Sequence, residues 1–241
     1  MVARAVAAPP PPTTRDSDIL EAPTTWADVL VMPEDPGKRQ EIIGGELTVS
    51  PSPGLDHQTV LDEIYARLSA HVRALGLGRI FGSSVDVKAS EYDVVVPDLL
   101  FVTAARQDII RRDAQTIDEP PDLVLEIISP GSAARRRDRI QKLAFYARFG
   151  VAEYWLVDPV ARTWETLILE GGVYRPLPPE GTIYRSRVVD GFAIDAAEVF
   201  AALDALDATD DDAGDVTGDA VAVAGALDEA VEPVAGTEDA G

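Results

Sequence analysis

The sequence predicts an α/β domain in which a mixed β-sheet is flanked by helices and carries extra β-hairpins. Apolar residues recur at helical spacing after Pro53, and short runs rich in valine, leucine and isoleucine indicate buried strands. Glycine pairs separate further strand-like runs and indicate hairpins. With 241 residues, of which 46% are hydrophobic, the chain is long enough to bury one sizeable core.

Charge and composition divide the chain into three parts. Residues 1–23 are rich in alanine, proline and threonine and are predicted to be disordered. Residues 24–200 form the predicted domain, with 30 acidic against 21 basic residues across positions 1–200. Residues 201–241 contain twelve acidic and no basic residues and are predicted to be a disordered acidic tail. The total net charge of −21 argues against strong nonspecific affinity for nucleic acid.

The expected cellular location rests on the absence of a membrane span, a signal peptide and cysteine from the sequence. No apolar run reaches the roughly 18 residues that cross a bilayer, and residues 1–12 lack the pattern of a signal peptide. The absence of cysteine excludes disulfides and thiolate zinc sites, and two histidines make a histidine-based metal site improbable. We therefore expect a cytoplasmic protein with no membrane partner.

The elements follow one another in an order that suits a mixed sheet. Thr24 or Thr25 can cap a short helix, and glycines end the two longer helices. The remaining predicted elements are a hairpin at 39–43 and 46–50, a helix at 60–75, strands at 79–88, 94–102 and 123–129, a helix at 132–149, a strand at 153–158, and a hairpin at 163–169 and 173–177.

Two acids lie in apolar strand-like runs. Asp98 ends a valine run, and Glu126 interrupts the otherwise apolar segment 123–128. Carboxylates are rarely buried unless they are paired or hold a metal, because desolvating an unpaired ion costs several kcal/mol. If the two strands are neighbours, both carboxylates can converge on one hard divalent cation, as in a metal-dependent phosphodiesterase. Alternatively, each acid forms a structural ion pair with an arginine or a lysine.

Several segments, in order and at sensible spacing, resemble the Uma-type restriction endonuclease family. The resemblance covers roughly residues 25–200. It rests on Arg39–Leu47, Asp56–Gln58, Val96–Phe101, Pro121–Pro130, Asp138–Tyr146 and Gly150–Asp158. That family is similar to the PD-(D/E)xK nucleases, whose mixed sheet is flanked by helices. The resemblance therefore implies a restriction-endonuclease-like fold and DNA as the substrate.

The resemblance also implies roles for individual residues. Asp98, Glu126 and Glu41 correspond to acids that bind Mg²⁺ or Mn²⁺. The superfamily has a lysine two residues after the second acid, but this chain has Ile128 there, which cannot orient water by a hydrogen bond. Lys142 on the following helix is the implied substitute. Alternatively, Lys142 pairs with Asp138 four residues earlier. A helical wheel puts Lys142 opposite the apolar stripe of that helix but near Phe145 and Phe149, which leaves open that both helix faces are covered.

Substrate contacts are expected at His57 and at the arginine cluster Arg135, Arg136 and Arg139. Arginines beside a helix N-terminus favour phosphate, although they also form an ordinary solvated face. His57 alternatively makes only a local cap or packing contact. We thus expect a Mg²⁺- or Mn²⁺-dependent DNA endonuclease that forms a homodimer. A catalytically inactive nuclease-fold protein that acts as an interaction module is the alternative.

Overall fold

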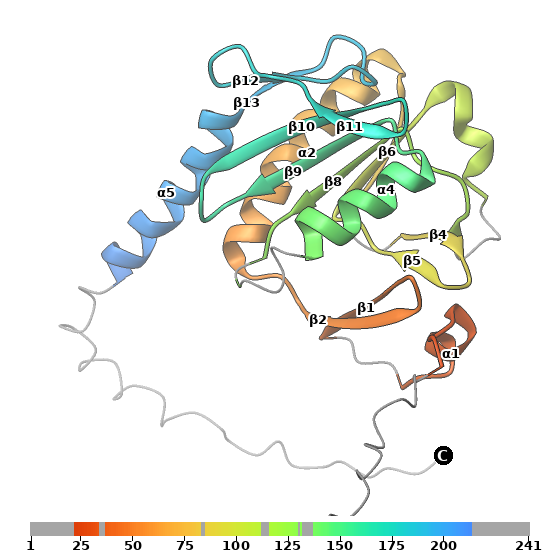
Figure 1. Ribbon diagram of the computed structural model, residues 1–241. Helices are drawn as coiled ribbons and strands as arrows, with labels where there is room; N and C mark the ends of the chain where they lie inside the picture. Colours follow the sequence, from red (N-terminus) through yellow and green to blue (C-terminus); the bar gives the residue numbers. More distant parts are fainter. Residues whose placement is uncertain are drawn as a thin grey trace, which may run out of the picture.

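The computed structural model describes residues 22–33, 37–82, 85–111, 116–129, 131 and 137–213, without the side chains of 137, 138 and 207–213. Within this part, a six-stranded sheet is covered by helices on both faces, and a five-stranded sheet lies at one edge of it (Figure 1). The mixed α/β architecture that the sequence predicts is confirmed. None of the described helices is long and apolar enough to cross a membrane.

The large sheet has the strand order β11-β10-β9-β8-β6-β3. Only β8 and β9 run parallel, and the other neighbours are antiparallel. Its strands are β3 (Gly78–Gly82), β6 (Leu99–Thr103), β8 (Leu123–Ile127), β9 (Glu153–Asp158), β10 (Thr163–Glu170) and β11 (Val173–Pro176). Every residue of β8 and β9 is buried, as expected for central strands covered on both faces.

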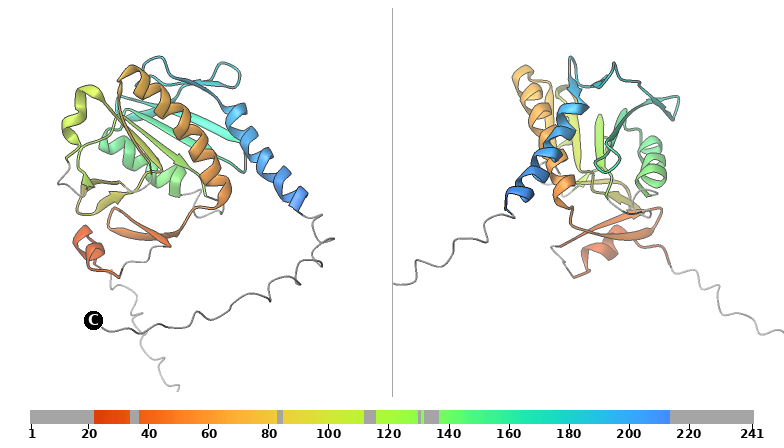
Figure 2. Two further views of the ribbon diagram at one scale, coloured as in Figure 1. Left: turned by 180° about the vertical axis from the view of Figure 1, so that it is seen from behind. Right: turned by 90° about the vertical axis from the view of Figure 1, so that its left-hand side faces the viewer.

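Helices cover the two faces of the large sheet unequally (Figure 2). One face packs against α2 (Leu55–Leu75) and α5 (Ala196–Ala213), and the other packs against α4 (Leu143–Phe149). Side chains alternate between the two cores along each strand, so that Leu125 belongs to the first core and Val124 to the second. Glu126 therefore points towards α4.

The small sheet has the order β2-β1-β5-β4-β7. The predicted hairpin forms its edge, and Gly44 and Gly45 have the positive φ values that its two-residue turn requires. Thr25 caps α1 (Trp26–Leu30), as the sequence predicts. The strands are β1 (Lys38–Ile43), β2 (Glu46–Pro51), β4 (Asp86–Ser90), β5 (Asp93–Val95) and β7 (Thr116–Ile117). A separate two-stranded ribbon consists of β12 (Ile183–Arg185) and β13 (Ala193–Asp195).

Two predicted strands are wrong because each is divided between the sheets. The expected strand at 79–88 becomes β3 in the large sheet and β4 in the small one. The expected strand at 94–102 becomes β5 and β6, with a break at Val96, Pro97 and Asp98. Proline has no backbone N–H for a ladder, which favours a break at this position. The chain thus passes from one sheet to the other through Pro97.

The expected end of the folded domain at residue 200 is also wrong. Helix α5 continues to Ala213, and Leu203 in this extension is buried in the core beside α2. Alanine and leucine favour the helix strongly enough that the aspartates between them do not end it. Of the segments predicted to be disordered, 1–23 and 201–241, the parts at 1–21 and 214–241 lie outside the described residues, as does the expected helix start at Ser132.

Candidate active site

The predicted acids meet where the small sheet joins the large one. Asp98 lies in the connection between β5 and β6, and its side chain is 2% exposed. Its Oδ1 atom accepts a hydrogen bond from the guanidinium of Arg39 at 2.9 Å. Its Oδ2 atom accepts the backbone N–H of Ile127 at 2.8 Å and lies 3.1 Å from Nε2 of His57. Asp98 thereby ties β1, α2 and β8 together.

The charges around Asp98 keep it ionised. Burial by itself would raise the pKa of Asp98, but the hydrogen bond from His57 and the charges of His57, Arg39 and Lys142 hold that pKa below its usual value. Because an ionised carboxylate can only accept, Nε2 of His57 carries the shared proton. Nδ1 of His57 is buried and has no hydrogen-bond partner among the described residues.

Glu126 is held by two donors from one helical segment. Its Oε2 atom lies 2.8 Å from Nζ of Lys142, and its Oε1 atom accepts a hydrogen bond from the hydroxyl of Tyr146 at 2.6 Å. Lys142 and Tyr146 are four residues apart, so both reach the carboxylate from the same face. Burial, followed by the charge of Glu126, raises the pKa of Tyr146 well above its ordinary value, which keeps this hydroxyl protonated.

Lys142 joins Glu126 to the third predicted acid. Its Nζ atom lies 2.8 Å from Oε1 of Glu41 on β1, and both side chains are 1% exposed. The same Glu41 oxygen accepts the backbone N–H of Val96 at 3.0 Å. One ammonium group therefore bridges a carboxylate of the small sheet and a carboxylate of the large sheet.

The helix that carries Lys142 departs from the predicted geometry. Residues Arg137–Lys142 form a π-helix that leads directly into α4. A π-turn holds more residues than an α-turn, so it rotates the following side chains relative to a simple helical wheel. As a result Lys142 is buried and Ile140 is 57% exposed, whereas a simple helical wheel puts Ile140 in the apolar stripe and Lys142 opposite it, on the side of Phe145 and Phe149.

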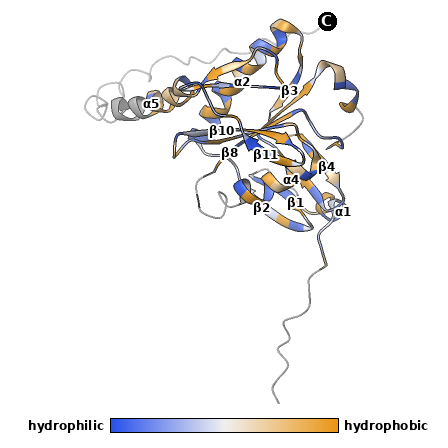
Figure 3. Ribbon diagram, turned by 45° about the horizontal axis from the view of Figure 1, so that its top comes forward, coloured by the Kyte–Doolittle hydropathy of each residue, from blue (hydrophilic) through white to orange (hydrophobic). Residues whose placement is uncertain are grey.

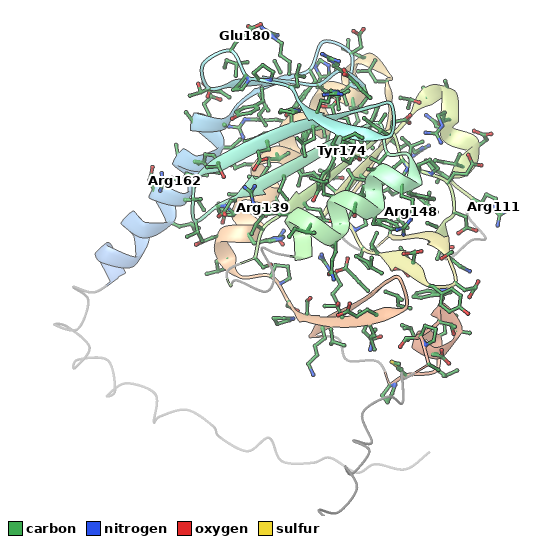
Figure 4. All side chains as sticks on the ribbon, in the orientation of Figure 1. Arg111, Arg139, Arg148, Arg162, Tyr174 and Glu180 are labelled. Carbon is green, nitrogen blue, oxygen red and sulfur yellow. The ribbon has the colours of Figure 1, made fainter. Side chains whose placement is uncertain are left out.

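The structure brings together Asp98, Glu126, Glu41, Lys142 and His57, which the sequence had placed in one site. It also contains the ion pairs of the alternative prediction, because Arg39 and Lys142 contact the acids. The arginine cluster does not join this group. Arg139, which is labelled in Figure 4, contacts Glu165 on β10 at 2.5 Å, and Arg135 and Arg136 lie outside the described residues.

Sequence reasoning assigned no role to three neighbours of the site. Arg39 lies in the predicted hairpin, and Tyr146 follows Lys142 by four residues, a spacing that could have indicated a shared face. Asp86 on β4 is the third. Burial, followed by the charge of Glu41, raises the pKa of Asp86 to about 6. No local pattern in the sequence singles out Asp86, because its environment depends on how β4 packs.

The donor set suits a hard divalent cation. Glu41, Glu126 and Asp98 supply carboxylate oxygens, the ligands that Mg²⁺ and Mn²⁺ prefer. Glu41 and Glu126 already flank one cationic group, the Lys142 ammonium. Within the described residues, no three acidic or histidine side chains are arranged around a common point for a metal. A metal bound here would therefore take over contacts that Lys142 or Arg39 now make.

Comparison with known proteins identifies the family. Residues 26–197 match the family described as Uma2, putative restriction endonuclease. The chain belongs to this family. No curated protein matches the chain. All five candidate site residues that meet at the sheet junction lie within the matched segment.

A solved structure shows the same fold. It is described as a putative nuclease belonging to DUF820 from Anabaena variabilis, and it is 19% identical in sequence. The match has a TM-score of 0.62 and covers 75% of this chain and 99% of the other. The fold class that the sequence predicts is therefore confirmed for the Uma2 domain.

Proposed function

We propose that this Uma2 domain is a metal-dependent DNA endonuclease whose active site is the acid cluster at the sheet junction. The observation that carries the proposal is the convergence of Glu41 and Glu126 on one buried ammonium group, that of Lys142. These residues come from the small sheet, the large sheet and the π-helix. Hydrophobic packing alone does not require three buried charges at one point, and desolvating them is costly.

Asp98, Glu126 and Glu41 would hold Mg²⁺ or Mn²⁺. When bound, the cation would polarise the phosphodiester and offset the negative charge that develops on it during hydrolysis. Glu41 and Glu126 already contact one cationic group, the Lys142 ammonium, so both carboxylates face a position where a cation would sit. Asp98 is oriented by Ile127 and His57, which fix its Oδ2 atom. The Oδ1 atom of Asp98, which now accepts a hydrogen bond from Arg39, could therefore exchange that contact for the metal.

Lys142 would orient the attacking water. The ammonium group has three donor protons, and two of them point to Glu126 and Glu41. Ile128 cannot orient water, because its side chain has no hydrogen-bond donor and is buried in the core beneath α4. The position of Lys142 against Glu126 supports the implied migration of the lysine from the strand to the helix.

Arg39 would contact the scissile phosphate. Its side chain is 20% exposed, more than that of any acid it approaches, and a guanidinium suits phosphate geometry. His57 would position Asp98. Contacts of Arg135, Arg136 and Arg139 with the substrate stay predictions, and a phosphate at Arg139 would have to compete with Glu165. The homodimer and the cytoplasmic location also stay predictions.

A non-catalytic role is the second candidate. The observation that favours it is the pairing of Asp98 with Arg39 and of Glu126 with Lys142, because these contacts satisfy the acids without a metal. In that case the fold persists and the domain serves as an interaction module. The two candidates differ in what the site binds and cuts.

Incubation of the full chain with supercoiled plasmid, linear DNA and RNA, each with Mg²⁺, Mn²⁺ or EDTA, tests the proposal. Asp98→Asn and Glu126→Gln should remain folded and lose metal-dependent cleavage. Glu153→Gln is the matched control, since Glu153 is an equally buried acid on the neighbouring strand. Cleavage that persists in folded Asp98→Asn, or a wild type inert with both metals, would favour the interaction module. Cleavage of RNA alone would correct the substrate.

A further inference from the structure

A second polar groove lies at the far end of α2 from the acid cluster. It has a volume of about 370 Å³ and is formed by α2, β3 and the 3₁₀ helix η1 (Ala104–Ile109). Its polar lining includes Tyr65, Ser69, Arg73, Arg79 and Gln107. Figure 3 labels α2 and β3, whose side-by-side packing forms the body of this region.

The arginines of this groove differ from most other cations of the described chain. Within the described residues, the side chains of Arg73 and Arg79 make no ion pair and no hydrogen bond, and the same holds for Arg111. By contrast, arginines elsewhere on the surface pair with carboxylates, as Arg148 does with Asp93 and Arg162 with Asp204 (Figure 4). In a chain of net charge −21, two unpaired guanidiniums that line one groove create a local cationic site.

Other polar groups in the groove are also available to a ligand. Ser69 is only 7% exposed, and its hydroxyl makes no hydrogen bond with the described residues. The side-chain amide of Gln107 likewise makes none within that part of the chain. Ser69 is buried, whereas Arg73, Arg79 and Gln107 are exposed side chains that line the same groove. A hydroxyl, an amide and two guanidiniums around one solvent-accessible cavity suit a polar, anionic ligand.

The β3 side of the groove is fixed by close packing of the β3 backbone against β6. Gly78 has φ +158°, and a Cβ atom there would collide with the carbonyl oxygen of Val102. This close approach holds Arg79 at the start of the edge strand β3, which pairs with β6. Arg73 lies in the last turn of α2, where a cation also favours the helix dipole, but that effect does not extend to Arg79.

We propose that this groove binds a phosphate group of a nucleotide or of a nucleic-acid backbone, at a site separate from the acid cluster. Guanidinium groups recognise phosphate with paired hydrogen bonds, and hydroxyl and amide donors complete such sites. Arg73 lies sixteen residues after His57 on α2. At 1.5 Å per residue the groove is therefore about 24 Å from the acid cluster. One phosphate cannot reach both, so the groove adds a function to the proposed active site.

Binding of a short fluorescein-labelled DNA duplex to the full chain in EDTA tests this assignment without any cleavage. The double variant Arg73→Ala/Arg79→Ala should bind the duplex more weakly at low salt. Its slope of log K against log salt should be shallower by about 1.8, because each lost phosphate contact changes the slope by about 0.9. Arg111→Ala is the matched control, since Arg111 also has no carboxylate partner among the described residues but lies outside the groove. It should bind as the wild type does.

A competition with AMP distinguishes the two sources of phosphate. Displacement of the duplex by AMP from the wild type, with AMP binding lost in the double variant, would assign the groove to a nucleotide. Arginine-dependent duplex binding that AMP does not displace would assign it to a nucleic-acid backbone. The proposal is overturned if the double variant binds both probes like the wild type, or if the wild type binds neither. These outcomes do not depend on whether the acid cluster cuts DNA.

Discussion

Glu153 on β9 and the buried acids Asp98 and Glu126 at the sheet junction are held by different kinds of donors. Glu153 on β9 is fully buried and accepts hydrogen bonds from neutral donors, namely Trp155, Ser186 and the backbone N–H groups of Arg187 and Val188. Asp98 and Glu126 are held instead by Arg39 and Lys142, with His57 and Tyr146 beside them.

The pKa values of Glu153 and Asp98 are shifted in opposite directions, as the difference in their donors predicts. Burial raises the pKa of Glu153 even though its hydrogen bonds oppose that change. For Asp98, the hydrogen bond and charges outweigh burial and lower the pKa. The backbone N–H groups of Arg187 and Val188 are fixed in the fold, so their hydrogen bonds to Glu153 hold the loop at 186–188 against the sheet. Charged side chains can exchange their partner for a metal or a phosphate, so the acid cluster is the group suited to chemistry.

The largest expected effect comes from removing the bridging cation. Lys142→Met should lower the free energy of unfolding by about 3–5 kcal/mol, because two buried carboxylates lose their counter-charge. Urea unfolding in EDTA measures the loss, and added Mn²⁺ should restore part of it. Lys88→Met breaks an exposed ion pair with Glu91 and should cost less than about 1 kcal/mol. Equal effects of the two substitutions would show that the charge of Lys142 does not stabilise the fold by neutralising Glu41 and Glu126.

A smaller effect is expected from the tyrosine that fixes Glu126. Tyr146→Phe should weaken Mn²⁺ binding by about tenfold to a hundredfold, as for other residues that orient a metal ligand. Isothermal titration calorimetry measures the affinity. Tyr174→Phe is the matched control, because Tyr174 is also buried and donates to the carbonyl of Val151. If both variants bind Mn²⁺ equally well, Tyr146 only supports packing.

The smallest effect is a difference in pH dependence. The folded pKa of Asp98 lies below the unfolded value of about 3.9, so its stabilisation is present above that pH and is lost as the pH falls through the folded pKa. The folded pKa of Glu153 is raised, so its ionisation opposes folding as the pH rises through the interval between its two pKa values.

Unfolding in EDTA across pH 3–7 compares these two acids. Relative to wild type, Asp98→Asn should lose less stability on acidification from about pH 5, since it lacks the group whose protonation is unfavourable. Glu153→Gln should lose less stability as the pH rises above about pH 4.3, the usual value of a glutamate. If the stability of Asp98→Asn and of Glu153→Gln depends on pH in the same way, Asp98 and Glu153 do not differ electrostatically.

The sequence predicts much of the fold because the determining signals are local. The hairpin at Gly44, the α2 stop at Gly76 and the buried run of β8 all follow from turn chemistry and periodicity. The direction in which Glu126 points follows from strand alternation. That Asp98 and Glu126 are buried beside charged partners was predictable, because acids in apolar runs need such partners.

Other features depend on tertiary contacts that no local pattern encodes. The break at Pro97 separates two sheets, and the π-helix turns Lys142 inward, so neither strand length nor a helical wheel was reliable there. Glu153 carries the same local signal as Glu126, an acid in an apolar strand. What distinguishes them is the donor. Apart from Trp155, the donors of Glu153 lie more than thirty residues later in the chain, at Ser186 and at the backbone of Arg187 and Val188.

Mn²⁺ titration of the full chain, followed by calorimetry and by electron paramagnetic resonance, tests most directly whether the charged acid cluster is the metal site. We predict that the wild type and Glu153→Gln bind Mn²⁺, while folded Asp98→Asn and Glu126→Gln lose most of that affinity. Equal Mn²⁺ binding by all four proteins, or none by the wild type, would contradict the assignment and leave the acids at the sheet junction as structural ion pairs.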